Sequence, residues 1–239
     1  GATENDPAPG SADTGSGAGD SPVDVADGTG TTPSDDVAEA PLLSANFAGS
    51  SSLNGKNSLY VLVYKKAGSG GHDHVVRSPN FTGNLTYRVG AIADCSVNVT
   101  VPVAALLNDE NEMRERVGLA DISGDWGWSL GGGRDKVNEN MLAKDQLDAA
   151  GHPNIRFTST VCRGNAGTSG TILVDGELTL RGVTRNVTWS VDVDVTGDRL
   201  QANGSLQIKQ SDYGITPYKL FNFENADAVD LVFDLDVNG

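Results

Sequence analysis

The sequence predicts an all-β domain in which seven or eight antiparallel strands enclose an apolar interior. Apolar and polar residues alternate with a period of two over most of the chain after residue 42, and helical patterns are confined to one stretch. Before residue 42, the chain is acidic, rich in glycine and proline, and has neither pattern. Because side chains of a strand point alternately to its two faces, this alternation indicates strands with one buried face.

The clearest strand lies between Asn186 and Val195, where every odd position is apolar and every even position is polar. Similar alternation, looser in the first two segments, predicts strands near 57–65, 83–92, 97–103, 174–180, 200–208 and 229–237. The apolar faces of these strands must be covered, either by a sheet that curls into a barrel or by two stacked sheets. The period alone leaves both architectures open.

Two short helices are expected in a crossover before the strand that begins near Ile155. Asp109, followed three residues later by Glu112, resembles a capping box, and this helix is expected to end at Gly118. A second helix is expected over about 136–147. Together, the two helices could cap one end of a barrel.

Residues 1–41 form a separate acidic segment. They hold nine carboxylates, seven glycines and five of the nine prolines, and no lysine or arginine. Their few apolar side chains cannot offset a chain entropy of about 1–2 kcal/mol per residue. We therefore predict a disordered acidic linker over 1–41 and a folded domain over 42–239. The domain has 23 acidic and 17 basic side chains, a net charge of only −6.

The composition excludes several classes of partner and scaffold. A net charge of −15 argues against nucleic acid, because that binding depends on lysine and arginine displacing counterions. The apolar stretches are only a few residues long, too short for a membrane-spanning helix. Cys95 and Cys162 allow at most one disulfide, with two free thiols as the alternative.

Three stretches resemble signature motifs of the YceI-like family. They are HPNIRFTST at 152–160, GELTLRGVTRNV at 176–187 and SDYGI at 211–215. The second is the most specific, because it closely matches the family's G-x-L-T-L-x-G-V-T-x-x-V hairpin. The resemblance covers residues 94–237 well and 45–93 weakly. It implies a lipocalin-like antiparallel barrel of about eight strands, which in this family of secreted or periplasmic bacterial proteins holds a polyisoprenoid chain or a related lipid.

The predicted inner face has the small side chains that such a cavity needs. Valine, leucine, glycine and alanine dominate it, and only 6% of the chain is aromatic, so an eight-stranded barrel would leave room for a ligand. A barrel filled by its own side chains is the alternative. We expect the ligand to contact Val99, Val101, Phe157, Leu178, Leu180, Val187, Trp189, Val191, Leu206, Ile208, Tyr213 and Phe233.

His72 and His74 favour a different function. Two imidazoles two residues apart on a strand point to the same face and could bind a metal ion or a haem. A third ligand is not evident from the sequence, and His152 lies in a YceI-like motif, where a structural role is expected. A metal- or haem-binding redox module that uses His72 and His74 is therefore the alternative function.

Other residues could assist a lipid ligand. Trp126 and Trp128 lie in a glycine-rich loop that could form a lid or pack on the barrel end. Arg134 or Arg181 could pair with a phosphate group, although a solvated surface position is the simpler expectation for both. The sequence holds no H-E-x-x-H metal motif and no P-loop, and hydrolysis is not expected.

The expected function is non-enzymatic binding, storage or transport of an isoprenoid or similar apolar lipid, for which a quinone is one candidate. No cofactor and no nucleic acid is expected. The resemblance implies a periplasmic or secreted protein. The acidic linker could tether it to the bacterial cell envelope, with a lipid anchor as one variant, and a tail that serves only solubility is the alternative. A homodimer is compatible with the sequence.

Overall fold

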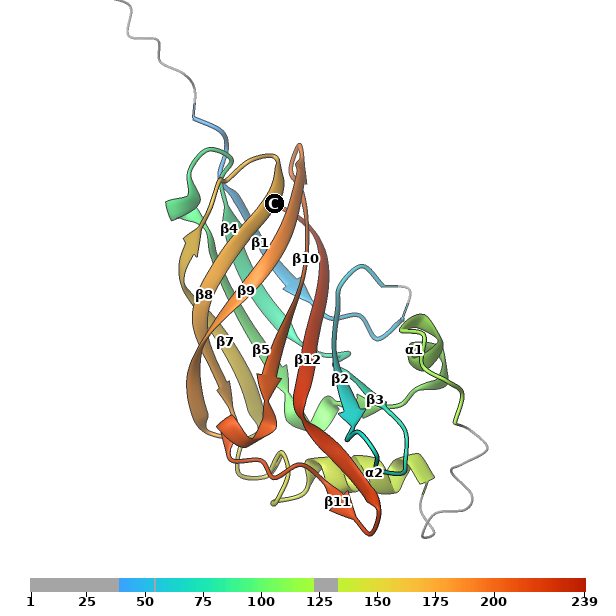
Figure 1. Cartoon of the computed structure of the whole chain (residues 1–239). Helices are drawn as coiled ribbons and strands as arrows, with labels where there is room; N and C mark the ends of the chain where they lie inside the picture. Colours follow the sequence, from blue (N-terminus) through green and yellow to red (C-terminus); the bar gives the residue numbers. More distant parts are fainter. Residues whose placement is uncertain (1–38, 54, 123–132) are drawn as a thin grey trace, which may run out of the picture. The chain divides into compact units, whose positions relative to one another are not determined.

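The computed structural model describes residues 39–53, 55–122 and 133–239. Within these ranges, the chain forms a twelve-stranded antiparallel sheet (Figure 1). Its strands are β1 (Leu43–Ala48), β2 (Ser58–Lys65), β3 (His74–Arg77), β4 (Thr82–Tyr87), β5 (Ser96–Pro102), β6 (Leu107–Asn108), β7 (Asn154–Arg163), β8 (Ser169–Leu180), β9 (Val183–Thr196), β10 (Arg199–Lys209), β11 (Lys219–Leu220) and β12 (Phe223–Asn238).

The sheet curls around one interior. Its strand order is β1-β4-β5-β7-β8-β9-β10-β12-β2-β3-β6, with β11 paired to β12. The edge strand β1 also contacts β12, and the terminal Gly239 lies beside Leu43. Eight strands lie on the path from β1 to β12, and β2, β3 and β6 continue the sheet beyond β12 and also contribute side chains to the lumen wall. The predicted antiparallel barrel of about eight strands is confirmed, and the sandwich alternative is wrong because the strands belong to one sheet.

The predicted alternation determines which residues reach the interior. Along β9, Trp189, Val191 and Val193 are buried, and the residues between them are exposed. All of β8 pairs with β9, from Val183 to Asp194 of β9. Buried positions on the two strands therefore lie side by side. Strand β1 shows the same pattern over only six residues, which is why the sequence pattern placed no strand there.

The crossover between β5 and β7 contains β6 and both helices, α1 (Asn111–Arg116) and α2 (Gly133–Leu142). The expectation of two short helices in this crossover is confirmed, although α2 starts and ends earlier than 136–147. α2 lies across the end of the barrel at which β11 is found (Figure 1). Short 3-10 turns are η1 (Ile92–Asp94), η2 (Val103–Ala105) and η3 (Gln210–Tyr213).

The predicted capping box at Asp109 is wrong. Glu110 is the residue at the N-terminal boundary of α1, and its side chain forms no capping hydrogen bond. Asp109 has a φ of 49° and is fully buried, and its carboxylate accepts hydrogen bonds from the Val75 backbone and from Arg114. These partners bind the carboxylate more strongly than a helix terminus would, because they include a buried guanidinium.

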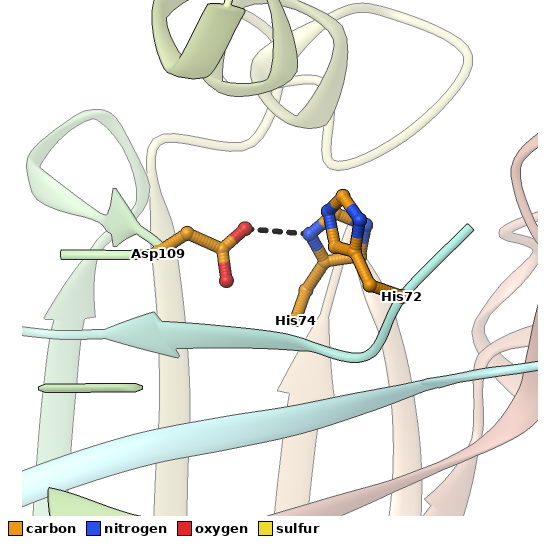
Figure 2. A group of neighbouring side chains, drawn as sticks. All are labelled: His72, His74 and Asp109. Atoms are coloured by element: carbon orange, nitrogen blue, oxygen red, sulfur yellow. Dashed lines mark hydrogen bonds and ion pairs between the residues drawn. The ribbon is translucent and has the colours of Figure 1, made fainter. Parts of the chain in front are cut away.

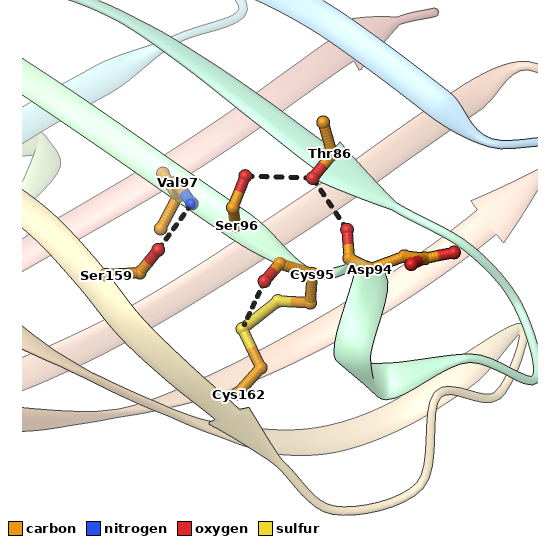
Figure 3. Close-up of a disulfide and its surroundings, with 7 residues drawn as sticks. All are labelled: Thr86, Asp94, Cys95, Ser96, Val97, Ser159 and Cys162. Atoms are coloured by element: carbon orange, nitrogen blue, oxygen red, sulfur yellow. Dashed lines mark hydrogen bonds between the residues drawn. A yellow bond between two sulfur atoms is a disulfide. The ribbon is translucent and has the colours of Figure 1, made fainter.

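Cys95 and Cys162 form a disulfide that joins β7 to the residue preceding β5 (Figure 3). The β5–β7 ladder stops before a bulge in β7 that follows Ser159, and Ser159 Oγ accepts a hydrogen bond from the Val97 backbone (2.8 Å). The disulfide therefore fastens the two strands beyond the end of their ladder. The disulfide alternative holds, and the free-thiol alternative does not.

Several predicted features lie outside the described residues. They are the acidic segment up to residue 38 and the loop with Trp126 and Trp128. The stretch GWSLG at 127–131, which has the G-x-S-x-G spacing of a hydrolase nucleophile, lies there too. Glu39, which belongs to the predicted linker, is described, and it forms an ion pair with Arg88 (2.5 Å).

Candidate ligand-binding cavity

A cavity of about 1070 Å³ runs through the lumen. Its wall is mostly aliphatic and aromatic, and it extends from Val193 and Leu200 at one end of the strands to Val137 and Met141 of α2 at the other. At the α2 end the lining includes the exposed residues Lys136 and Phe223, so the cavity reaches the surface there. Its volume is slightly above the range of about 300–1,000 Å³ that is typical of small-molecule sites.

Three aromatic rings from three strands form a row across the lumen. Trp189 of β9 lies between Phe157 of β7 and Phe233 of β12, with ring centroids 6.2 and 5.3 Å away in edge-to-face orientation. Glycines on the intervening strands make room for the outer rings. A Cβ on Gly176 would lie 2.5 Å from the Phe157 ring, and one on Gly204 would lie 3.0 Å from the Phe233 ring. Large and small side chains thus alternate around the barrel at this depth.

Most residues predicted to contact the ligand line the cavity. Nine of the twelve do so: Val99, Val101, Phe157, Leu178, Leu180, Trp189, Val191, Ile208 and Phe233. Their contact with a ligand stays a prediction. β1 and β2 also contribute to the wall, through Phe47, Leu59, Val61 and Val63, which were not among the predicted contacts. The alternation of Leu59, Val61 and Val63 is the signal that could have identified the three residues of β2.

Val187, Leu206 and Tyr213 do not line the cavity. The β9–β10 ladder ends at the pair Ser205 and Ser190, and beyond it the two strands part. η3, which holds Tyr213, contacts both strands beside this gap, and Tyr213 is fully buried there. Val187 and Leu206 lie on the parted segments, where they are half-buried and pack against the core without lining the cavity.

A small polar region interrupts the apolar wall near β3 and β6. His72, His74, Ser78 and Asn108 all line the cavity. The Oγ of Ser78 and the Oδ1 of Asn108 are buried, and neither has a hydrogen-bond partner in the described part of the chain. The Ser78 hydroxyl could donate a hydrogen bond to a guest or to water, or accept one, and the Asn108 amide oxygen could accept one.

His74 lines the cavity and also contacts the buried pair of Asp109 and Arg114; Figure 2 shows His74 and Asp109. Its Nδ1 lies 2.5 Å from Oδ2 of Asp109, and Arg114 Nη1 donates to Oδ1 of the same carboxylate at 2.5 Å. Burial alone would raise the pKa of Asp109, but the bonds from His74, the Val75 backbone and Arg114 outweigh it and lower the pKa below its ordinary value. Asp109 is therefore ionised, and it holds the His74 ring in one orientation.

The rim of the cavity carries an exposed aromatic ring. Phe221, at the turn between β11 and β12, is 79% exposed and has a φ of 54°, which is unusual for a bulky residue. The neighbouring Leu220 and Phe223 line the cavity. The backbone N–H of Gly70 donates to Asn222 O (2.9 Å), which joins the loop before β3 to this hairpin.

The three motif stretches meet at the α2 end of the barrel. Arg181, in the β8–β9 turn, donates to the carbonyls of Gly214 and, at 2.9 Å, of Lys144. Arg185 donates to the carbonyl of Asp212 (3.0 Å). The His152 ring packs against Gly182: a Cβ on Gly182 would lie only 2.6 Å from Cε1 of His152. The motifs therefore build the fold at this end, and Arg181 binds backbone carbonyls instead of standing free for a phosphate. Arg134 is exposed on α2.

Comparisons with known proteins agree with this architecture. BcnA of Burkholderia cenocepacia has a similar fold, with a TM-score of 0.56, 20% sequence identity, and coverage of 77% of this chain and 97% of BcnA. A polyisoprenoid-binding domain of Saccharophagus degradans, implicated in plant cell wall breakdown, has a TM-score of 0.51 and 14% identity, with coverage of 83% and 99%. At these identities, the similarity shows the fold alone. No curated protein matches the sequence.

The family model describes a larger part of the chain than any single motif. The model of the YceI-like domain matches residues 63–237, which run from β2 to the end of β12 and include the three motif stretches and most of the cavity wall. The fold and the apolar cavity agree with this match. The chain belongs to the YceI-like family.

Proposed function

We propose that the protein binds an isoprenoid or a similar long apolar lipid inside the barrel, without catalysis, and stores or transports it. The observation that supports this most directly is the apolar cavity of about 1070 Å³. Moving an apolar chain from water to such a wall is favourable by itself, and no chemical step is needed. The family match and the polyisoprenoid-binding neighbour support the same class of ligand.

The volume indicates how long the chain could be. A 150 Å³ protein cavity holds benzene, about 25 Å³ per carbon, so 1070 Å³ corresponds to roughly 40 carbons. At about −0.3 kcal/mol per non-hydrogen atom, roughly 20 carbons give tens of micromolar affinity and roughly 40 give nanomolar affinity. A long lipid would therefore stay bound through purification.

The experiment is extraction of the purified full chain into organic solvent, followed by mass spectrometry and by titration with a fluorescent isoprenoid. We expect an isoprenoid lipid in the extract and saturable uptake by the emptied protein. Val99→Trp, which places an indole in the cavity wall, should reduce uptake at least tenfold. Val161→Trp is the matched control, because Val161 is 49% exposed and does not line the cavity. An empty extract together with no saturable uptake would overturn the proposal.

The absence of catalysis can be tested separately. Ser129 lies in the GWSLG stretch, and an esterase that used it would hydrolyse a lipid ester and lose activity in Ser129→Ala. We expect no turnover of such an ester by either protein. A rate that depends on Ser129 would contradict the non-enzymatic part of the proposal.

We also propose that the protein works in the periplasm or outside the cell, with the acidic N-terminal segment as a tether to the envelope. The Cys95–Cys162 disulfide supports this, because disulfides persist in oxidising compartments. Fractionation of the source cells, with detection by an antibody to the folded domain, tests it. Recovery in the cytoplasmic fraction would overturn it.

A further inference from the structure

Three side chains with metal-binding atoms come together beside the cavity wall. His72, His74 and Asp109 each place one such atom within 4.8 Å of the others (Figure 2). His72 lies in the loop before β3, His74 begins β3, and Asp109 follows β6. The pairing of β3 with β6 brings these distant parts of the sequence together. The sequence indicated the two histidines but not the third residue.

The carboxylate is already oriented toward the imidazoles. Oδ1 of Asp109 is held by Arg114 Nη1 (2.5 Å) and by the Val75 backbone N–H (3.1 Å). Its other oxygen, Oδ2, therefore points to His74 Nδ1 (2.5 Å). Arg114 and Asp109 are both almost completely buried, so this orientation is fixed by packing as well as by hydrogen bonds. Partners of this kind position the first ligands of many metal sites.

His72 brings a second imidazole to this carboxylate. Its ring lies 4.7 Å from the His74 ring, centroid to centroid, and both rings line the cavity. Two adjacent imidazoles beside a buried carboxylate form the donor set of a three-ligand zinc site.

We propose that His72, His74 and Asp109 bind a divalent ion of the zinc class, with a fourth position open toward the cavity. At bond lengths of about 2.0–2.2 Å and tetrahedral angles, two ligand atoms are roughly 3.3–3.6 Å apart. The His74 Nδ1–Asp109 Oδ2 pair, at 2.5 Å, must therefore widen when the ion binds. His74 would bind the ion through Nδ1, the ring nitrogen that faces the carboxylate. Arg114 keeps the carboxylate neutralised when no ion is bound.

Zinc is favoured over harder ions by the donor set. Imidazole nitrogens suit Zn²⁺, Co²⁺, Ni²⁺ and Cu²⁺, whereas Mg²⁺ and Ca²⁺ prefer oxygen ligands only. The inference goes beyond lipid binding and does not depend on it, because it concerns an ion at the wall and can be measured in protein without lipid.

The experiment is titration of the full chain, stripped of metal with a chelator and of lipid with solvent, first with Co²⁺ and then with Zn²⁺. We expect one Co²⁺ per chain, with the visible absorption of a tetrahedral site, and displacement by Zn²⁺ but not by Mg²⁺. His72→Asn and His74→Asn should each weaken binding at least about tenfold, since even the loss of an outer partner costs about 10–100-fold.

His152→Asn is the matched control, because His152 lies at the motif end of the barrel and outside the cluster. It should bind Co²⁺ as the unchanged chain does. Asp109→Asn tests the third ligand, but it also disturbs a buried ion pair and could unfold the protein. His72→Asn avoids this problem, because His74, the Val75 backbone and Arg114 still hold the Asp109 carboxylate in that variant.

The proposal would be overturned by two results. One is a stripped protein that binds none of these ions below millimolar concentration. The other is Co²⁺ binding that is equally strong in the unchanged chain, His72→Asn and His74→Asn, which would place the ion elsewhere, for instance on the acidic N-terminal segment. Equal loss in His152→Asn would count against it in the same way.

Discussion

The indole of Trp189 packs edge to face against Phe233, with ring centroids 5.3 Å apart, in the middle of the apolar lumen. Trp189 is only 7% exposed, and its Nε1 has no hydrogen-bond partner among the described residues. A buried donor without an acceptor costs about 1–3 kcal/mol. The Trp189 Nε1–H is therefore a donor in the lumen that a guest with an oxygen atom could satisfy.

Replacement of Trp189 by Phe tests whether the guest carries such an oxygen. The change removes the donor and keeps an aromatic ring in place. An isoprenoid quinone should lose about two- to tenfold in affinity, which corresponds to about 0.5–1.5 kcal/mol for one hydrogen bond. Squalene, an isoprenoid hydrocarbon without oxygen, should bind as before. Equal weakening of both, measured by quenching of the remaining tryptophan fluorescence or by calorimetry, would show that the ring's shape matters and not its N–H.

Gly176 makes room for the Phe157 ring, and a larger residue should destabilise the barrel. A Cβ at this position would lie 2.5 Å from both the ring and the carbonyl oxygen of Thr158, so the ring and the strand must both shift. We expect Gly176→Ala to lower the free energy of unfolding by about 1–3 kcal/mol, measured by urea denaturation. Phe157→Leu combined with Gly176→Ala should recover part of this loss. Purely additive effects in the double variant would mean that the ring and the glycine are not coupled.

The period of two was sufficient to predict the long strands because it is a local property. β8, β9, β10 and β12 are each longer than ten residues, and each contains the segment predicted from the alternation, at 174–180, 186–195, 200–208 and 229–237. β3, β6 and β11 have two to four residues, too few for any period to be visible. Their pairing depends on neighbours that are distant in the sequence.

The errors at Asp109 and Tyr213 have a common physical origin. Asp109 has the local spacing of a helix cap, but His74 and Arg114 reach its carboxylate from other elements. Tyr213 follows a strand that faces the lumen, but β9 and β10 part before it, and η3 buries Tyr213 beside both strands, outside the cavity lining. In both cases a tertiary contact overrides a local pattern, and one sequence alone does not contain that contact.

Loss of the disulfide should destabilise the domain more than any change on its outer surface. Cys95 and Cys162 are 67 residues apart, and in the chain-entropy model such a bridge contributes about 4 kcal/mol. We expect this loss in the double variant Cys95→Ala with Cys162→Ala, measured by urea denaturation. A reductant should lower the stability of the unchanged chain to a similar level. The same reductant should have no effect on the double variant, and a clear effect there would mean that the loss has another cause.

The stability of the barrel should fall in acid because of Asp236 on β12. Hydrogen bonds from Arg199, followed by the nearby Lys56, lower its pKa to about 2 from an ordinary 3.8. A lowered pKa means that this ionised carboxylate stabilises the fold above pH 4, and that its contribution is lost as the pH falls toward 2. Asp236→Asn should be less stable than the unchanged chain at pH 7, and its stability should decline less steeply between about pH 4 and pH 2. Asp145→Asn, an exposed position in the turn after α2, should follow the unchanged chain. Parallel acid curves for the unchanged chain and Asp236→Asn, recorded by circular dichroism, would show that the link between β10 and β12 does not depend on this charge.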